Sequence, residues 1–322
     1  MIKKKLKIGI LFGGKSAEHE VSINSANNVI KALAKDKYQI FKIKIGKDGK
    51  FNLNSLKKMD VIFPVLHGPF GEDGSMQGLL KILNLPFVGP SVLGSALGMD
   101  KDVMKRLFRE ANIPIGKFET VRTGEEISFQ KLSKRLGLPI FVKPANLGSS
   151  VGIHKIKNEK EFKIAIKDAF QYDSKLVFEE NINGREIECS VLGNEDPIAS
   201  LPGEIIPNAD FYSYDSKYLD AKSICKIPAE LPKETIKKIQ AMAVLVFKVL
   251  NCEGMGRVDF FLKENGEILV NEINTIPGFT AISMYPKMWE ASNLPPTKLL
   301  DKLISLALER FKRDQKLKTT VK

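Results

Sequence analysis

Residues 254–278 read GMGRVDFFLKENGEILVNEINTIPG and contain the most specific pattern in the chain. The two apolar stretches on either side of an Asn-Gly pair favour a β-hairpin. In such a hairpin Asp259 lies near Glu272 and Asn274. Glu272 and Asn274 are two residues apart, so their side chains project from the same face of the strand. Two carboxylates and an amide oxygen on one face are typical of a Mg²⁺ site that leaves positions for substrate phosphates.

Arg257 belongs to the same pattern, because it lies two residues before Asp259 and shares its face. A guanidinium there could hold a phosphate or a developing oxyanion with two hydrogen bonds. Without a cation, the two acids would repel each other across the strands. The alternative is a solvated polar face of a sheet, which does not require these residue types at this spacing.

A second pattern, KPANLGSSVGI at residues 143–153, has strand-like sequence on both sides. Its loop offers backbone N–H groups and hydroxyls to phosphate oxygens, at Gly148, Ser149, Ser150 and Gly152. Lys143, at the end of the preceding strand, adds a cation that can reach the same phosphates. The alternative is a plain β-hairpin turn, which needs neither the two hydroxyls nor the lysine.

A polar loop, HGPFGEDGSMQGLL at residues 67–80, follows the apolar run VIFPVL. Three early glycines around His67, Glu72 and Asp73 indicate tight backbone geometry beside ionisable side chains. Loops at the ends of strands often carry functional residues. A structural role for His67 is the alternative.

The N-terminal stretch KIGILFGGKSAEHEVS, residues 7–22, satisfies the Walker A pattern of nucleoside triphosphatases. However, Gly9 lies inside an apolar run that predicts a buried strand, and the loop begins at Gly13-Gly14. We therefore interpret the match as accidental. Glu18 then lies at the C-terminal end of a strand, where open α/β sheets bind ligands. The alternative for this stretch is a helix capped by Ser22 and solvated charges.

The order of segments predicts a mixed α/β and α+β fold. Strand-like and helical runs alternate over residues 1–96, which favours a small domain with a mostly parallel sheet. The glycine-rich GPSVLGSALGMD near residue 96 is interpreted as a turn at a domain boundary. A second α+β unit extends to residue 183. Strands, a long polar loop around residues 208–223 and two helices follow.

Composition excludes several classes of protein. The net charge is +12, but lysine supplies 42 of the 50 basic residues and arginine 8, and no nucleic-acid-binding module appears. Nucleic acid is therefore not an expected partner. No apolar run approaches the ~18 residues of a membrane helix. The three cysteines and three histidines have no metal-ligand spacing. We expect a cytoplasmic protein without a membrane partner.

Eight motifs in order over almost the whole chain resemble the D-alanine–D-alanine ligases, which are ATP-grasp enzymes. They are GGKSAEHEVS, HGPFGEDGSMQGLL, MDK at 99–101, KPANLGSSVG, FEENINGRE, FYSYDSKY, GMGRVDF and NEINTIPGFTAISMYP. The resemblance implies a three-domain ATP-grasp ligase: an N-terminal parallel-sheet α/β substrate domain (1–96), a central subdomain (97–183) and a C-terminal subdomain (184–322). It also implies a homodimer.

The resemblance further implies site residues. ATP would contact Lys101, Lys143, Ser149, Ser150, Glu179, Glu180, Ile182, Glu186, Phe211 and Lys217. Two Mg²⁺ (or Mn²⁺) ions would be held by Asp259, Glu272 and Asn274. The two D-alanine substrates would contact Glu18, His67, Arg257, Ser283 and Met284. The catalytic set would be Glu18, Ser149, Tyr218, Arg257 and the backbone of Gly278. The hinge departs from the commonest family form at Glu180-Asn181, which leaves its side-chain roles open.

Three alternatives remain at the level of sequence. A ligase that makes D-alanyl-D-lactate would use a hydroxyl acceptor, and Tyr218 favours an amine instead. Another ATP-grasp carboxylate–amine ligase would not need both AEHEVS and HGPFGEDG. A basic nucleotide- or nucleic-acid-binding protein would not need two carboxylates and an amide on one face. The D configuration of the substrate rests on the resemblance alone.

Overall fold

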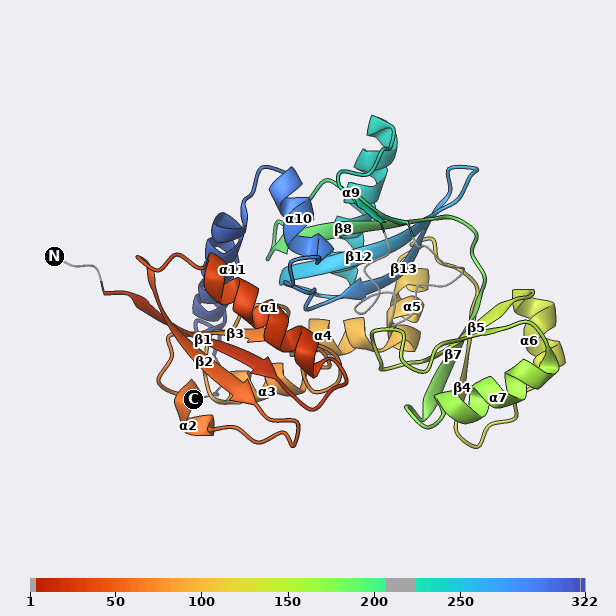
Figure 1. The fold of residues 1–322 in the computed structure, drawn as a ribbon, viewed down its shortest axis with the longest axis horizontal. Coiled ribbons are helices and arrows are strands. Elements are labelled where there is room, and N and C mark those ends of the chain that lie inside the picture. Colours follow the sequence, from red (N-terminus) through yellow and green to blue (C-terminus); the bar gives the residue numbers. More distant parts are fainter. Residues whose placement is uncertain (1–3, 207–223, 319, 322) are drawn as a thin grey trace.

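A computed structural model describes residues 4–206, 224–318 and 320–321. The strands of these residues form three sheets, each built from one continuous part of the chain (Figure 1). One sheet is parallel and is accompanied by helices, and the other two are antiparallel. The mixed α/β and α+β class predicted from the sequence is confirmed. Among the described helices, none has both the length and the apolar character needed to cross a membrane.

The N-terminal sheet has the strand order β2-β1-β3 and is parallel throughout, as predicted. Its strands are β1 (Leu6–Gly13), β2 (Tyr38–Ile45) and β3 (Val61–Val65), and the helices of this part are α1 (His19–Ala32), α2 (Leu53–Leu56) and α3 (Ser75–Ile82). Residues of β1 and β3 are almost completely buried, because the parallel strands are covered on both faces.

The second sheet has the order β4-β7-β5-β6. Its strands are β4 (Phe118–Arg122), β5 (Ile140–Pro144), β6 (His154–Ile156) and β7 (Lys175–Glu180), and helices α6 (Phe129–Leu136) and α7 (Glu159–Ala169) belong to the same part. The predicted strand–glycine loop–strand pattern is confirmed, since β5 and β6 are antiparallel neighbours joined by residues 145–153.

The third sheet has the order β11-β10-β8-β12-β13, with β9 paired to β8. Its strands are β8 (Arg185–Gly193), β9 (Ile198–Ala199), β10 (Gly203–Ile206), β11 (Ile224–Lys226), β12 (Gly254–Leu262) and β13 (Ile268–Asn274), with helices α9 (Lys233–Val249) and α10 (Met284–Ala291). The predicted hairpin is present as β12 and β13, and a β-bulge interrupts its register between Asp259 and Phe260.

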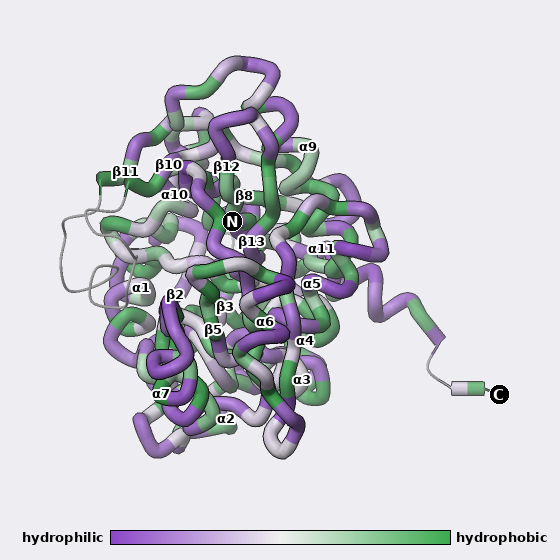
Figure 2. Tube along the Cα trace, turned by 90° about the vertical axis from the view of Figure 1, so that its right-hand side faces the viewer, coloured by the Kyte–Doolittle hydropathy of each residue, from purple (hydrophilic) through white to green (hydrophobic). Residues whose placement is uncertain are grey.

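The C-terminal helix α11 (Pro296–Asp314) packs against the N-terminal sheet and lies near α1 in Figure 1. Its buried leucines share one apolar core with residues of β1 and β3. The Arg310 guanidinium is buried and donates hydrogen bonds to the carbonyls of Phe87 and Gly89. The two ends of the chain therefore stabilise one unit, while the domain limits at 96/97 and 183/184 stay a prediction. Figure 2 shows the described residues that follow α11 extending away from the body of the molecule.

The stretch GPSVLGSALGMD is not the turn that its glycines suggested. It contains helix α4 (Val92–Met99), which is followed by α5 (Lys101–Glu110). The glycines permit close packing: a Cβ at Gly98 would lie 2.4 Å from Cγ2 of Thr275, and one at Gly94 would lie 2.8 Å from the carbonyl oxygen of Asn251. Tertiary packing has therefore overridden the low helix propensity of glycine.

We predict opposite effects on stability for two helical glycines. Gly98→Ala should lower the free energy of unfolding by about 1–3 kcal/mol, because its methyl group would overlap Thr275. Gly78→Ala in α3 should raise it by about 0.4–1 kcal/mol, because a Cβ there meets no atom within 4 Å. Urea denaturation of both variants measures the difference. Equal midpoints would contradict the packing explanation for α4.

Candidate functional site

A cavity of about 870 Å³ is lined by residues of the two antiparallel sheets and their loops, and by α1 and two loops of the N-terminal part. Every site residue that the family resemblance implies in the described part of the chain lines it: Glu18, His67, Lys101, Lys143, Ser149, Ser150, Glu179, Glu180, Ile182, Glu186, Arg257, Asp259, Glu272, Asn274, Gly278, Ser283 and Met284. Gly152 of the glycine-serine loop does not line it. Phe211, Lys217 and Tyr218 lie outside the described residues. The fold thus brings together residues from positions 18 to 284 of the chain.

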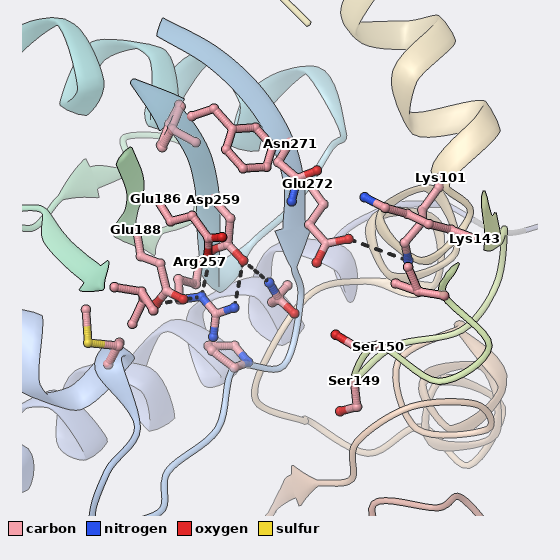
Figure 3. Close-up of a pocket in the computed structure, with 18 of the residues that line it drawn as sticks. Lys101, Lys143, Ser149, Ser150, Glu186, Glu188, Arg257, Asp259, Asn271 and Glu272 are labelled. Carbon is pink, nitrogen blue, oxygen red and sulfur yellow. Dashed lines mark hydrogen bonds and ion pairs between the residues drawn. The ribbon is translucent and has the colours of Figure 1, made fainter. Parts of the chain in front are cut away.

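The hairpin β12–β13 presents its polar face to this cavity (Figure 3). Asp259 is paired with Glu272 across the strands, and Arg257 is paired with Asn274. Nε and one terminal nitrogen of Arg257 each lie 2.7 Å from a different carboxylate oxygen of Asp259. Nε of Arg257 also lies 3.1 Å from Oε2 of Glu188 on β8. The predicted shared face of Arg257 and Asp259 is therefore present, as a two-point ion pair.

The donor set on this face fits Mg²⁺. Side chains of Asp259 and Glu272 are 16% and 24% exposed, so their oxygens reach the cavity while remaining partly desolvated. The amide nitrogen of Asn274 lies 2.9 Å from Asp259, and rotation of the amide would present its oxygen instead. Among the described residues, no three His, Cys, Asp or Glu side chains are grouped to hold a metal. A cation here would therefore also need the amide and substrate oxygens.

Lysines face this acidic surface from the central part of the chain. Nζ of Lys101 donates to the carbonyl of Leu147 at 2.8 Å and lies 3.5 Å from Oε2 of Glu272. In Figure 3, Lys101, Lys143 and the two serines lie on one side of the cavity, opposite the acids and Arg257. This arrangement leaves cationic groups beside a space between the two surfaces, which suits an anionic ligand.

Glu179 at the end of β7 lies between two lysines. Its two carboxylate oxygens are 2.9 Å from Nζ of Lys105 and 2.6 Å from Nζ of Lys143. Burial alone would raise the pKa of Glu179, but the two positive charges lower it to about 2. Burial likewise opposes the charge of Lys143, yet Glu179 and Glu272 raise its pKa. Glu179 and Lys143 are therefore both charged at neutral pH.

The loop between β5 and β6 has an unusual backbone. Ser149 and Ser150 have φ angles of +53° and +60°, a left-handed conformation that is uncommon for residues other than glycine. Such strained backbone is concentrated at ligand-binding sites. The hydroxyl of Ser149 donates a hydrogen bond to Oε1 of Glu18. This contact joins the loop between β5 and β6 to the turn between β1 and α1.

Glu18 reaches the cavity because of the turn that precedes it. Gly13 and Gly14 have φ angles of +94° and +95°, and a Cβ at Gly13 would lie 2.4 Å from the carbonyl oxygen of Ile45. Gly9 lies within β1, as predicted, so a Walker A loop is absent here. Lys15 lies over the ring of Phe70 at 5.2 Å and, within the described residues, is not part of the cavity lining.

Ser22 does not cap α1, in contrast to the alternative considered from the sequence. Ser22 belongs to α1 itself, and its side chain is completely buried between the helix and the sheet. It accepts a hydrogen bond from the N–H of Gly13 at 2.8 Å and donates one to the carbonyl of Val65. Ser22 therefore fastens α1 to the ends of β1 and β3.

Comparison with known proteins agrees with this geometry. Residues 107–305 match the family of the D-ala D-ala ligase C-terminus, and residues 7–58 and 51–90 match that of the D-ala D-ala ligase N-terminus. The chain belongs to the D-alanine–D-alanine ligase family. A curated D-alanine–D-alanine ligase of Oceanobacillus iheyensis is 49% identical, and the alignment covers 98% of this chain and 99% of that protein.

Solved structures of the same family superpose closely on the chain. The D-alanine–D-alanine ligase from Coxiella burnetii is 42% identical with a TM-score of 0.88, covering 98% of this chain and 97% of that one. The ligase from Bacillus anthracis complexed with ATP is 32% identical with a TM-score of 0.83, covering 96% and 99%. The predicted ATP-grasp fold is therefore confirmed.

At Glu180-Asn181, where the sequence departs from the commonest family form, each side chain has a partner within the protein. A carboxylate oxygen of Glu180 accepts a hydrogen bond from the backbone N–H of Lys117 at 2.7 Å. The amide nitrogen of Asn181 donates to the side chain of Asn183 at 2.8 Å. Both hydrogen bonds thus stabilise the segment 180–183 and its contact with Lys117.

Several ionisable residues that line the cavity were not among the predicted site residues, and three of them, Glu72, Lys105 and Glu188, lie close in the sequence to residues already noted. Two of them had a signal in the sequence. Lys105 follows Lys101 by four residues on α5 and shares its helix face. Glu188 follows Glu186 by two residues on β8 and shares its strand face. Glu72 lies in the noted polar loop, but the sequence did not indicate its partners.

The Glu72 carboxylate accepts hydrogen bonds from the N–H groups of Gly68 at 2.7 Å and Ile276 at 3.2 Å. Burial and the neighbouring charge of Glu18 raise the pKa of Glu72 to about 8. Because the folded state then binds a proton that the unfolded state releases, the contribution of Glu72 to stability falls as the pH rises from about 4.5 to 8.

We predict that Glu72→Gln makes the free energy of unfolding less dependent on pH between 5 and 8, because the substitution removes this titration. Urea denaturation at several pH values measures the slope. Glu267→Gln is the matched control: Lys263 lowers the pKa of Glu267, so its titration lies below this range. Identical slopes for Glu72→Gln and the unmodified protein would contradict the prediction.

Proposed function

We propose that the cavity joins two D-alanine molecules in an ATP-dependent reaction and supplies the dipeptide for peptidoglycan precursors. Membership of the D-alanine–D-alanine ligase family supports this function. The observation that carries it is the meeting of three groups in one cavity: the Glu18–Ser149 contact, the lysines of the central part and the acids of the hairpin.

We place ATP between the central and C-terminal parts. Lys101, Lys143 and the backbone of the Ser149–Ser150 turn lie where they can hold phosphate oxygens. Glu186 would bind the ribose, and backbone groups near Ile182 would read the adenine ring, since the Glu180 side chain has a partner in the protein. Phe211 and Lys217 are proposed ATP contacts from outside the described residues.

Asp259, Glu272 and Asn274 would hold the two Mg²⁺ or Mn²⁺ ions. Such ions neutralise phosphate charge and thereby favour phosphoryl transfer. Arg257 pairs with Asp259 and lines the same cavity, so its guanidinium would lie within reach of substrate oxygens beside the residues that would hold the ions.

The chemistry follows from the weakness of a carboxylate as an acyl donor. Glu18 would bind the ammonium of the first D-alanine, with His67 nearby, while the carboxylate of that substrate takes the γ-phosphoryl group of ATP. The amine of the second D-alanine, held by Ser283 and Met284, would attack the carbonyl carbon in its neutral form; the C–N bond forms, the C–O bond to phosphate breaks, and the departing phosphate takes the proton that the amine loses. Arg257 and the backbone of Gly278 would stabilise the oxyanion. Tyr218, with Glu18 and Ser149, would help to exclude water from the acyl phosphate.

The cellular setting is also a proposal. A reaction that consumes ATP requires a compartment that contains ATP, which supports a cytoplasmic location. A homodimer and the domain limits at residues 96 and 183 are proposed from the family resemblance. Light scattering of the purified protein tests the homodimer, and limited proteolysis tests the domain limits.

Phosphate release from ATP tests the reaction. We expect release in the presence of D-alanine and Mg²⁺, and loss of release when either is omitted or when EDTA is added. A panel of L-amino acids, other D-amino acids and D-lactate defines the acceptor. Turnover that is independent of D-alanine would contradict the proposed function.

A pair of substitutions in the N-terminal turn separates the two interpretations of its glycine-rich sequence. Glu18→Ala should lower kcat/KM for the first D-alanine by about 10- to 100-fold, because a hydrogen-bonded charge pair with the substrate is worth about 1.5–3 kcal/mol. Lys15→Ala should leave the KM for ATP within about twofold, because Lys15 contacts Phe70 outside the cavity. Loss of ATP binding in Lys15→Ala would restore the Walker A interpretation.

A further inference from the structure

The segment 276–279, which begins two residues after the end of β13, is held by side chains of the N-terminal part of the chain. At its beginning, the N–H of Ile276 donates to Glu72 at 3.2 Å, and the carbonyl of Ile276 lies 3.1 Å from Nδ1 of His67. At its end, the N–H of Phe279 donates to Oγ of Ser25 at 3.2 Å, and Nδ2 of Asn28 donates to the carbonyl of Phe279 at 3.1 Å.

These contacts enclose Gly278, whose backbone lines the cavity. Residues on both sides of it have their amide and carbonyl groups fixed by side chains more than two hundred positions earlier in the sequence. The position of the Gly278 backbone therefore depends on α1 and on the loop after β3. Glu18, at the start of α1, belongs to the same N-terminal part.

The contacts of His67, at the centre of this arrangement, fit a neutral imidazole. A carbonyl oxygen can only accept a hydrogen bond, so Nδ1 of His67 is protonated and donates a hydrogen bond to the carbonyl of Ile276. Nε2 lies 3.2 Å from Oγ of Ser25 and accepts the hydroxyl proton of that serine. Oγ of Ser25 in turn accepts the N–H of Phe279. The chain of hydrogen bonds Phe279–Ser25–His67–Ile276 is thus complete with a neutral imidazole.

Burial agrees with this assignment. His67 is 5% exposed and Ser25 is fully buried. Burial lowers the pKa of His67, although the charge of Glu18 acts in the opposite direction. Both ring nitrogens of His67 therefore have protein partners in the state that dominates at neutral pH. Within the described residues, Ser25 is not part of the cavity lining, so it can influence a substrate only through other groups.

We infer that Ser25 and His67 are positioning residues that hold segment 276–279 and thereby place the Gly278 backbone opposite the first-substrate pocket. This inference rests on the proposed function, in which Gly278 stabilises the oxyanion. It assigns His67 a role different from direct contact with D-alanine. It also assigns a role to Ser25, which no motif in the sequence had indicated.

Ser25→Ala tests the inference, and Ser22→Ala is its matched control. Both serines are fully buried in α1 and each bridges two partners, but Ser22 connects α1 to β1 and β3 rather than to segment 276–279. We expect kcat for D-alanine-dependent phosphate release to fall about 10- to 100-fold in Ser25→Ala, with KM for ATP and D-alanine within about threefold. Ser22→Ala should lose a similar amount of thermal stability but retain kcat within about threefold.

His67 provides a second test through graded substitutions. His67→Ala should lower kcat as Ser25→Ala does. His67→Asn retains a side-chain N–H near the position of Nδ1, so it should recover part of the kcat that His67→Ala loses. If His67 served only the stability of the fold, His67→Asn and His67→Ala variants of equal thermal stability would have equal kcat. If His67→Ala instead raises the KM for the first D-alanine and leaves kcat unchanged, His67 binds substrate directly and the inference is wrong.

Amide hydrogen exchange gives a readout that does not depend on turnover. Peptides containing residues 276–279 should exchange faster in Ser25→Ala than in Ser22→Ala. Equal exchange rates, or equal kcat values in the two variants, would overturn the positioning role. If the unmodified protein releases no phosphate with D-alanine, the proposed function fails, while the exchange comparison still decides whether Ser25 holds the segment.

Discussion

The carboxylates of Asp259 and Glu272 face each other on the hairpin β12–β13. Their repulsion explains why cationic side chains lie beside them in the cavity. The strand register pairs Asp259 with Glu272, so their negative charges lie on one partly desolvated surface. Each needs a nearby positive charge, because like charges across strands destabilise a sheet. Arg257 provides one from the same strand, and Lys101 provides the other from α5. The acids of the C-terminal sheet are thereby joined to the central part of the chain.

A second set of ion pairs strengthens this junction. Lys105 contacts Glu179 on β7, and its Nζ lies 3.4 Å from the carbonyl of Asn271 on β13. Lys143 on β5 reaches the same glutamate. Breaking one partner of a buried pair leaves an uncompensated charge, which costs several kcal/mol. Lys101 and Lys105 on α5 thus connect the central part of the chain to β13, whereas the pair of Lys143 with Glu179 lies within one sheet.

Much of the fold was predictable, because local patterns and local structure coincide there. The alternation in β12 and β13, the apolar runs of the parallel sheet and the glycine-serine loop each have a periodicity or a turn signal that depends on near neighbours. Helix α4 was not predictable in this way. Gly94 and Gly98 lower its intrinsic helix propensity, and the contacts that require them, with Asn251 and Thr275, come from much later in the chain.

The residue types of the site are a property of the sequence. The acids at 259 and 272, the lysines at 101 and 143 and the serines at 149 and 150 carry their chemistry wherever the chain places them, and short-range spacing puts several on common faces. Tertiary structure alone decided which of these groups meet. Contacts such as Glu18 with Ser149, Lys105 with Glu179 and His67 with Ile276 join elements between 74 and 209 residues apart. No local periodicity encodes such pairs, because their geometry depends on how three sheets pack around one cavity.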